Sequence, residues 1–263
     1  MKNVKIHKPV KSLLKGLAIL EVFACQKSAL SFEELTVKTG MPKSTVFRFL
    51  HTLISRNYIS FDARAKKYFF GPRAMTLGFA VLNLELKDLA LPYLEDLSRI
   101  SDQHVNLGIL DGTEVVFIER IPKRDVVNIN LPVGSRVSCY RSSTGRAILA
   151  FLDQVKFQSI LSKLLNDAEA VQHIGTRGRK LTAALNEVRR DGYALNDEEV
   201  IKGVRAIAAP IFNAQRQVEG AVNMPVFSYN VSRSELIKRY LPMLLDTAER
   251  ISTARGFMKP ERI

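Results

Sequence analysis

The stretch LSFEELTVKTGMPKSTVFRFLHTLISRNY, residues 30–58, predicts two short helices joined by a tight turn. Ser31 and Glu34 form the Ser-x-x-Glu pattern of a capping box, which marks the start of the first helix. Gly40 can adopt the left-handed conformation that ends a helix, and Pro42 suits the first turn of the next one. The sequence therefore predicts a helix-turn-helix over this stretch.

The second helix, which begins near Lys43, has two chemically different faces. Apolar residues recur at i, i+3, i+4 and i+7 and form the stripe Val46, Phe49, Leu50 and Leu53. The outward face carries hydroxyl, aromatic and basic groups at the same spacing: Ser44, Phe47, Arg48, His51 and Ser55. An ordinary helical hairpin with a solvated polar face has the same local pattern, so the residues that follow decide between the two interpretations.

Two β-prone runs, residues 57–61 and 68–70, come directly after this helix. They flank the short basic segment DARAKK, residues 62–67, which predicts a hairpin with a cationic tip. Phosphate contacts supply much of the affinity of a DNA-binding protein and position the helix that reads bases. A basic hairpin at this place is typical of the wing of a winged helix.

The charge of the chain is concentrated in its first third. The 263 residues carry a net charge of +13, and residues 1–88 hold 15 Lys/Arg against 6 Asp/Glu, a net +9. The other 175 residues hold 24 against 20, a net +4. An excess of positive charge on the predicted winged helix is what binding to nucleic acid requires.

The opening residues superficially resemble a signal peptide, but Lys15 and Glu21 interrupt the apolar run. No uncharged run approaches the length of a membrane span, so we expect a protein that does not bind a membrane. Cys25 and Cys139 are far apart and lack metal-ligand or redox-motif spacing, so we expect a cytoplasmic protein in which both thiols are buried. A redox role for Cys139 is the alternative.

The predicted elements divide the chain into three parts: a winged helix-turn-helix domain over 1–72, a linker helix over 73–88 and a larger domain over 89–263. In the larger domain Asp111-Gly112 is a hairpin turn signal between strands 105–110 and 114–121. The remaining predicted elements are strands 126–131, 203–212 and 218–225, and helices 93–100, 145–152, 181–190 and 234–255. Hairpins with interspersed helices predict an α+β fold with an antiparallel sheet.

Two segments of the larger domain carry unusual polar chemistry. Residues 141–146, RSSTGR, place hydroxyls and a glycine at a helix start, where backbone N–H groups could meet an anion; capping by Ser142 or Ser143 is the simpler alternative. Residues 192–199 predict an acidic turn before a strand, or simply a solvated loop. Neither segment pairs a nucleophile with a base, and the sequence has no metal-ligand spacing, P-loop or dinucleotide motif. We therefore expect no catalytic residues, metal or cofactor.

The order of GMPKSTVFRFLHTL, YFFGPRAMTLG, LPVGSRVSCYRSSTGRAILA and GYALNDEEVIKGVRAIAAPIF resembles the IclR family of bacterial transcriptional regulators. The sequence of the third block is most similar to that of family members that control aromatic-acid and β-ketoadipate catabolism. The resemblance implies a winged helix followed by a GAF-like effector domain, in dimers or dimers of dimers, with a small organic acid as effector. It places the effector site on Val126, Ile129, Ser143, Thr144, Gly145, Asn196, Ala206, Asn223 and Pro225.

Three of these positions depart from a pattern common in the family. An acidic residue often stands where this chain has Asn196, a cysteine or serine where it has Ala206, and a serine where it has Asn223. Asparagine both donates and accepts hydrogen bonds, so an anionic effector is still expected.

These observations predict an effector-controlled, sequence-specific transcription factor, most often a repressor in this family, that binds a double-stranded DNA operator. The residues expected to contact DNA are Lys43, Ser44, Thr45, Phe47, Arg48 and His51 on the helix, and Arg64, Lys66 and Lys67 on the wing. One alternative is an enzyme acting on a small organic acid, with the winged helix used only for assembly. Another is a DNA-binding module without a ligand, whose pocket is filled by side chains.

Overall fold

The computed structural model describes residues 8–24, 26, 28–82, 85–122 and 132–258. The chain forms two compact units, residues 1–83 and 84–263. The predicted linker range, 73–88, spans the division between them. Within the described residues no helix is long and apolar enough to cross a membrane.

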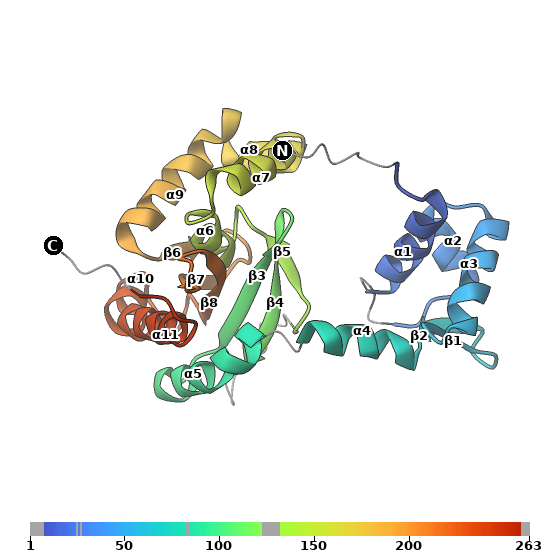
Figure 1. Ribbon diagram of the computed structural model, residues 1–263, viewed down its shortest axis with the longest axis horizontal. Coiled ribbons are helices and arrows are strands. Elements are labelled where there is room, and N and C mark those ends of the chain that lie inside the picture. Colours follow the sequence, from blue (N-terminus) through green and yellow to red (C-terminus); the bar gives the residue numbers. More distant parts are fainter. Residues whose placement is uncertain (1–7, 25, 27, 83–84, 123–131, 259–263) are drawn as a thin grey trace. The chain divides into compact units, whose positions relative to one another are not determined.

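The first unit is a three-helix bundle with a small hairpin, followed by a fourth helix (Figure 1). Its elements are α1 (Lys11–Ala24), α2 (Phe32–Thr39), α3 (Lys43–Ser55), β1 (Ile59–Asp62), β2 (Lys67–Phe70) and α4 (Pro72–Leu82). The strands pair antiparallel, with Asp62 opposite Lys67 at the turn. The predicted helix-turn-helix and wing are confirmed.

The turn between α2 and α3 forms for the reasons that the sequence indicates. The Ser31 hydroxyl accepts a hydrogen bond from the Glu34 N–H at 3.2 Å, and the Glu34 carboxylate accepts one from the Ser31 N–H at 2.7 Å. Gly40 ends α2 with φ = 63°, a left-handed conformation that costs glycine little. Pro42 is the N-cap of α3 and not a residue of its first turn.

The core of the first unit consists of Ile19, Phe23, Leu30, Leu35, Val46, Leu50 and Ile59. Val46 and Leu50 confirm the predicted inner stripe of α3. Val37 is 81 % exposed, because it lies on the outer face of the short helix α2. Leu13 and Leu17 of α1 are also exposed, at 62 % and 44 %, and the inner face of α1 is formed by Ile19 and Phe23.

The second unit is built on a six-stranded antiparallel sheet in the order β5-β4-β3-β8-β7-β6. The strands are β3 (Val105–Asp111), β4 (Glu114–Ile121), β5 (Arg136–Ser138), β6 (Ala194–Asp197), β7 (Val204–Phe212) and β8 (Val218–Phe227). β3 pairs with β8 at the centre, which brings the hairpin from the start of the domain against the hairpin from its end.

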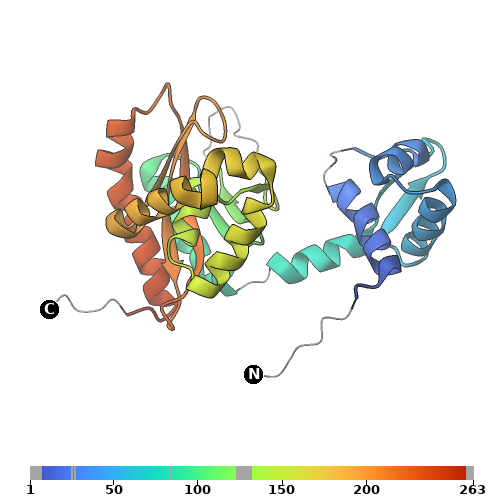
Figure 2. The ribbon, with the colours of Figure 1, turned by 90° about the horizontal axis from the view of Figure 1, so that it is seen from above.

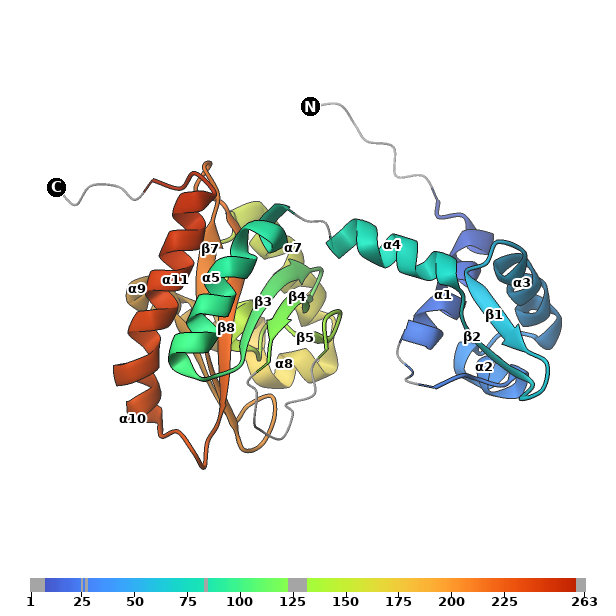
Figure 3. The same ribbon diagram turned by 90° about the horizontal axis from the view of Figure 1, so that it is seen from below.

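Helices cover both faces of this sheet. One face carries α5 (Glu85–Ser101) and the closing segment α10 (Arg233–Glu235), the π-helical turn η2 (Leu236–Tyr240) and α11 (Leu241–Ala254). Figure 3 shows α5 and α11 side by side over it. Figure 2 shows the yellow helices of the other layer. These are α6 (Ser143–Leu149), α7 (Gln154–Leu165), α8 (Ala168–Ile174), η1 (Thr176–Gly178) and α9 (Arg179–Asp191).

Each face has its own hydrophobic core. Leu94 and Leu97 of α5 and Leu244 and Ile251 of α11 belong to the first. Leu149 of α6 and Leu185 of α9, among others, belong to the second. The second unit is therefore a three-layer domain. Its α+β fold with an antiparallel sheet confirms the prediction.

Several predicted boundaries are wrong. The expected helix 73–88 is divided between α4 and α5, with residues 83 and 84 outside the described part. α5 begins at Glu85 and continues through Pro92, because its buried stripe keeps one face packed on the sheet although proline removes a backbone hydrogen bond. The range 234–255, predicted as one helix, contains the π-helical turn η2, and Pro242 lies at the start of α11 directly after it.

The predicted acidic turn within 192–199 is also wrong, because Ala194–Asp197 forms the edge strand β6 and pairs with β7. Its alternating burial identifies it as a strand, with Ala194 and Asn196 facing inward. The strand predicted for 126–131 lies outside the described residues. The helices α7 and α8 and the strand β5 had not been predicted.

Candidate functional site

The outer face of α3 presents the residues expected to contact DNA. Lys43, Ser44, Arg48 and His51 are exposed, and Phe47 keeps 60 % of its surface exposed although it is apolar. Thr45 is half-buried at the edge of this face. Because Val46 and Leu50 hold the opposite face in the core, the outward direction of these side chains is fixed by packing.

The hairpin tip adds a second basic surface. Arg64, Lys66 and Lys67 are all exposed. The Asp62 carboxylate accepts hydrogen bonds from the N–H groups of Arg64 at 2.8 Å and Ala65 at 3.1 Å, which orders the turn. Lys66 has φ = 53°, so the tip is a tight turn and not a loose loop. Its three cations are therefore presented on an ordered hairpin.

Residues of α1 also contribute to this surface and had not been predicted. A cleft of about 410 Å³ lies between α1 and α3, lined by Ser12 and Lys15 of α1 and by Thr45, Arg48, Phe49 and Thr52 of α3. Lys15 places another cation beside Arg48. The three-residue spacing of Ser12 and Lys15 on one face of a helix is the signal in the sequence that could have indicated them.

The second unit contains a small cavity between the sheet and α6. Six of the residues expected to bind an effector line it: Ser143, Thr144, Asn196, Ala206, Asn223 and Pro225. Pairing across the sheet explains how residues distant in sequence meet, since Asn196 lies opposite Ala206, which lies opposite Pro225. Asn223 is two residues from Pro225 on β8 and therefore shares its face.

The start of α6 closes the cavity on the helix side. Ser142 is the N-cap, and its hydroxyl accepts a hydrogen bond from the Gly145 N–H at 3.1 Å and donates one to the Ser138 carbonyl at 2.9 Å. The capping alternative for Ser142 is therefore confirmed. Gly145 does not line the cavity; a Cβ there would collide with the Cys139 backbone, so glycine is needed for close packing.

Asn223 is the centre of a buried hydrogen-bond network. The Asn106 amide, opposite it on β3, donates to the Asn223 side-chain oxygen at 2.9 Å. The Asn223 amide donates to the Ser143 hydroxyl at 3.1 Å and the Ile207 carbonyl at 3.4 Å. Separately, the Asn196 amide donates to the Arg141 carbonyl at 2.7 Å. These contacts fix the amide groups that face the cavity.

Thr144 differs from these neighbours. It is 1 % exposed, and its hydroxyl has no hydrogen-bond partner among the described residues. Burying a hydroxyl without a partner costs about 1–3 kcal/mol. Thr144 is therefore a buried polar group available to a ligand at the cavity wall.

The cavity is small and its lining carries no charged side chain among the described residues. Its volume is about 50 Å³, whereas ligand pockets typically have about 300–1,000 Å³. Its apolar lining residues are Phe117, Val137, Val200, Ile201, Val204, Ala206 and Pro225. Val200 and Ile201 belong to the segment between β6 and β7, residues 198–203, which we call the 198–203 loop. A bound organic acid would require this loop or another part of the lining to move.

The alternative of a redox role for Cys139 has little chemical basis. Cys139 is fully buried, and burial raises the pKa of its thiol to about 12. A protonated, inaccessible thiol reacts slowly with oxidants. Cys25 lies outside the described residues, as do the predicted site residues Val126 and Ile129. Asn106, Phe117, Val137, Val200, Ile201 and Val204 line the cavity without having been predicted.

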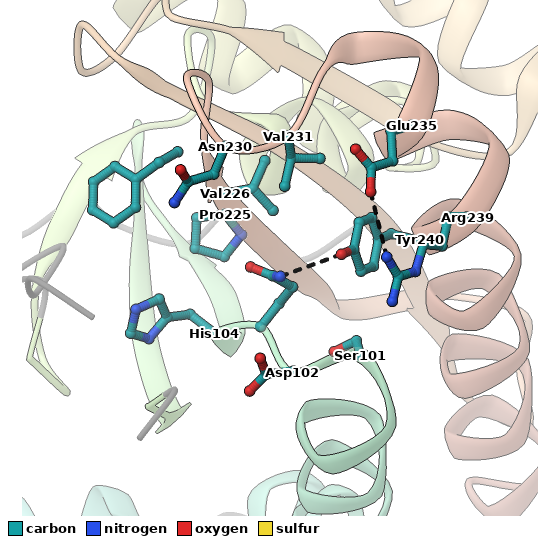
Figure 4. A pocket seen from close by; sticks show the side chains of 12 residues that line it. Ser101, Asp102, His104, Pro225, Val226, Asn230, Val231, Glu235, Arg239 and Tyr240 are labelled. Carbon is teal, nitrogen blue, oxygen red and sulfur yellow. Dashed lines mark hydrogen bonds and ion pairs between the residues drawn. The ribbon is translucent and has the colours of Figure 1, made fainter. Parts of the chain in front are cut away.

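A separate cavity of about 300 Å³ lies near the ends of α5 and β8 (Figure 4). The Gln103 amide donates to the Tyr240 hydroxyl at 3.4 Å across it. Arg239 pairs with Glu235 at 3.4 Å and its guanidinium lies 5.0 Å from the centre of the Tyr240 ring. The structure shows no cluster of three or more metal-binding side chains within the described residues.

An outward-facing recognition helix, a basic wing and a separate domain with its own cavity define a two-domain DNA-binding regulator. Residues 12–63 match the IclR helix-turn-helix domain, and residues 78–253 match the bacterial transcriptional regulator IclR C-terminal domain. The chain belongs to the IclR family of bacterial transcriptional regulators.

Known relatives agree with this assignment. The chain is 34 % identical over 245 residues to the Pca regulon regulatory protein of Pseudomonas putida, covering 89 % of this chain and 80 % of the relative. It is 28 % identical over 249 residues to the HTH-type transcriptional regulator XynR of Escherichia coli, covering 94 % and 98 %. These relatives are named as regulators, in agreement with the expectation that the protein is not an enzyme.

Solved structures share the whole fold. An IclR family transcriptional regulator from Brucella abortus superposes with a TM-score of 0.77 at 28 % identity, covering 94 % of this chain and 93 % of that one. An IclR homologue from Microbacterium hydrocarbonoxydans, crystallised with 4-hydroxybenzoate, has a TM-score of 0.74 over 92 % and 98 %. At 22 % identity this second likeness concerns the fold alone.

Proposed function

We propose that the protein is a repressor whose affinity for its DNA operator is changed by a small organic acid bound in the cavity beneath α6. The observation that carries the effector half of this proposal is the unpartnered Thr144 hydroxyl beside the fixed amides of Asn196 and Asn223. A ligand with oxygen acceptors would satisfy Thr144, and an apolar body would fit the remaining lining.

The proposed DNA contacts divide by chemistry. Arg48 has the planar donor geometry for a bidentate contact to guanine in the major groove. Ser44, Thr45 and Lys43, at the start of α3, can contact phosphates or base edges, with Phe47 and His51 beside them on the same face. The wing residues Arg64, Lys66 and Lys67 would bind the backbone or the minor groove.

The chemistry of the cavity favours one kind of acid. Neutral donors surround it, and its described lining has no cation to balance a dianion. A carboxylate would therefore depend on amide and hydroxyl donors and on the first N–H groups of α6, which have no acceptor within the helix. We infer an aromatic or otherwise largely apolar monocarboxylate. The similarity to the Pca regulon regulatory protein supports the branch that controls aromatic-acid and β-ketoadipate catabolism. The similarity of the block LPVGSRVSCYRSSTGRAILA supports the same branch.

Control by the acid requires that it bind one conformation better than another. The cavity of about 50 Å³ is much smaller than a typical ligand pocket of roughly 300–1,000 Å³, so the acid would select a conformation with a wider cavity. The 198–203 loop supplies Val200 and Ile201 to the lining and belongs to no strand, so its displacement is the simplest way to widen the cavity.

We further propose that the protein acts as a homodimer or dimer of dimers. Leu13, Leu14 and Leu17 of α1 and Met75 and Leu77 of α4 are large apolar residues that are 44–63 % exposed. Such exposed apolar surface is typical of a contact between protein chains. A dimer would place two α3 helices on a near-palindromic operator.

Fluorescence anisotropy with the DNA flanking the protein's own gene tests this proposal. The titration is run at two salt concentrations, with and without 4-hydroxybenzoate, other aromatic monocarboxylates and dicarboxylates. We expect salt-sensitive, site-selective binding that one aromatic acid changes. Unselective binding under every condition would contradict the proposal.

The small cavity also favours a second candidate, a DNA-binding module that takes no ligand because side chains fill its pocket. Thermal unfolding separates the two, since a ligand that binds only the native state must raise the apparent stability. Selective DNA binding with no acid-dependent rise in Tm would favour the module without a ligand.

A further inference from the structure

A cavity of about 330 Å³ in the second unit collects basic side chains from separate elements. Its charged and polar lining residues, which we call the basic pocket, are Tyr140, Arg141, Arg146, His173, Lys180 and Glu199. We propose that the basic pocket is a second ligand site, which binds a small dianion, a phosphate or a dicarboxylate, in competition with Glu199.

The basic side chains converge from distant parts of the sequence. Arg141 precedes α6 and Arg146 lies on it, while His173 lies in the last turn of α8 and Lys180 near the start of α9. The C-terminal end of a helix favours nearby cations, which accounts for His173 in the last turn of α8. It does not account for the two arginines, which come from another element.

Positive charge exceeds negative charge around this cavity. Arg141, Arg146 and Lys180 line it with a single carboxylate, Glu199. Glu169 approaches Arg141 at 3.6 Å, but its side chain is 70 % exposed and does not line the cavity. The charged side chains that line the cavity carry a net charge of +2, so the pocket has room and charge for an anion.

Arg146 is the most buried of these cations and is incompletely satisfied. Its side chain is 12 % exposed; one terminal nitrogen donates to the Glu199 carboxylate at 2.6 Å and to the Arg141 carbonyl at 2.7 Å. Its Nε is buried and has no hydrogen-bond partner among the described residues. A ligand with two or more oxygens could take the place of Glu199 and contact both edges of the guanidinium.

The cavity in Figure 4 is a useful contrast within the same unit. It is of similar size, about 300 Å³, but its lining carries the two carboxylates Asp102 and Glu235 with the single arginine Arg239. These two cavities therefore differ in charge balance and not in volume. That difference is the reason to assign anion binding to the basic pocket.

The basic pocket shares structural elements with the cavity beneath α6. Glu199 belongs to the 198–203 loop, whose Val200 and Ile201 line that cavity, and Arg141 also donates to the Glu199 carbonyl. The Arg141 carbonyl in turn accepts from Asn196. A dianion that replaced Glu199 would remove one attachment of the loop. This linkage rests on the proposed effector function, whereas the anion site itself does not.

Isothermal titration calorimetry of the full chain without DNA tests the anion site, with inorganic phosphate and succinate as separate probes in a chloride buffer. We expect at least one probe to bind. Lys180→Ala should weaken that binding about tenfold, the effect of one lost charge-assisted contact, and Glu199→Gln should strengthen it about as much. Binding of phosphate alone, or of succinate alone, would identify which dianion the pocket takes.

The wing variant Lys67→Ala is the matched control, because the DNA-binding surface also attracts anions. It should leave the measured affinity unchanged. No heat of binding with either probe would overturn the anion site, as would equal affinities in the wild type and the Lys180→Ala and Glu199→Gln variants. Weaker binding only in Lys67→Ala would assign the anion to the wing and would also overturn the proposed site in the basic pocket. None of these outcomes depends on an operator or an aromatic acid.

Discussion

The outer face of α3, which we propose to bind DNA, and the cavity beneath α6 present polar groups in opposite ways. On α3 the side chains proposed to contact DNA are exposed, and the core behind them consists of apolar residues that only hold their direction. In the cavity, Asn106, Ser143 and Asn223 are nearly fully buried and fix one another by hydrogen bonds. The exposed surface should therefore tolerate substitution without loss of stability, whereas substitution of the hydrogen-bonded residues of the cavity should lower it.

Gly145→Ala should have the largest effect, because the new Cβ would collide with the Cys139 backbone. We expect a loss of about 3 kcal/mol or more in the free energy of unfolding of the second unit. Gly192→Ala is the control: its site is open, and the positive φ of 79° should cost only about 1 kcal/mol. Urea unfolding followed by circular dichroism measures both, and equal losses would show that the packing around α6 is not tight.

Arg48→Ala should leave stability unchanged but remove a base contact. We expect a loss of about 1–3 kcal/mol of discrimination at one base position of the operator. Anisotropy titrations with operators substituted at single positions measure it. Arg179→Ala, which removes an exposed cation from the second unit, is the control for net charge. Unchanged selectivity in Arg48→Ala would refute a base-reading role.

Thr144→Val should change stability and binding in opposite directions. It removes a buried hydroxyl without a partner at nearly constant volume, so we expect the ligand-free protein to gain about 1 kcal/mol. The same change should weaken binding of the effector acid. Thermal unfolding with and without the acid measures both effects. A less stable variant, or one with full acid affinity, would show that the hydroxyl is not the ligand contact.

The smallest expected effect concerns acid pH. A hydrogen bond from Arg255 lowers the pKa of Glu219, with Asn213 as a second donor. A carboxyl whose folded-state pKa is lowered stabilises the fold above its ordinary pKa, and this contribution is lost as the pH falls through the lowered value. Glu219→Gln should therefore be less stable than the wild type at pH 7, by about 1 kcal/mol at most, and the difference should disappear as the pH falls below about 4.5. Urea unfolding at pH 7, 4.5 and 3 measures this, and a constant difference would contradict it.

The contrast between the two regions also explains what the sequence could predict. The faces of α3 depend on spacing within a single helix, and the caps at Ser31 and Gly40 on local hydrogen bonds. These determinants are local, so the helix-turn-helix and the wing were predicted closely. Val37 is apolar and yet exposed, and periodicity along the sequence does not show where such a short helix meets its neighbours.

The cavity depends on contacts between residues far apart in the chain. Asn106 and Asn223 are 117 residues apart and meet only because β3 and β8 pair at the centre of the sheet. Spacing along the chain could not indicate this pairing. The family resemblance, and not the spacing, therefore predicted the cavity residues, and Asn106 was not among them. The basic pocket was missed for the same reason, since its cations come from separate elements.

The central claim is that the first unit reads DNA and the second changes that reading through a bound acid. The most direct test measures operator affinity with and without the effector acid in four proteins: the wild type, Arg48→Ala, Thr144→Val and the double variant. We expect Arg48→Ala to weaken binding and keep the response to acid, and Thr144→Val to keep binding and lose the response, with both effects present in the double variant. A Thr144→Val variant that responds to the acid as the wild type does would contradict this division of roles.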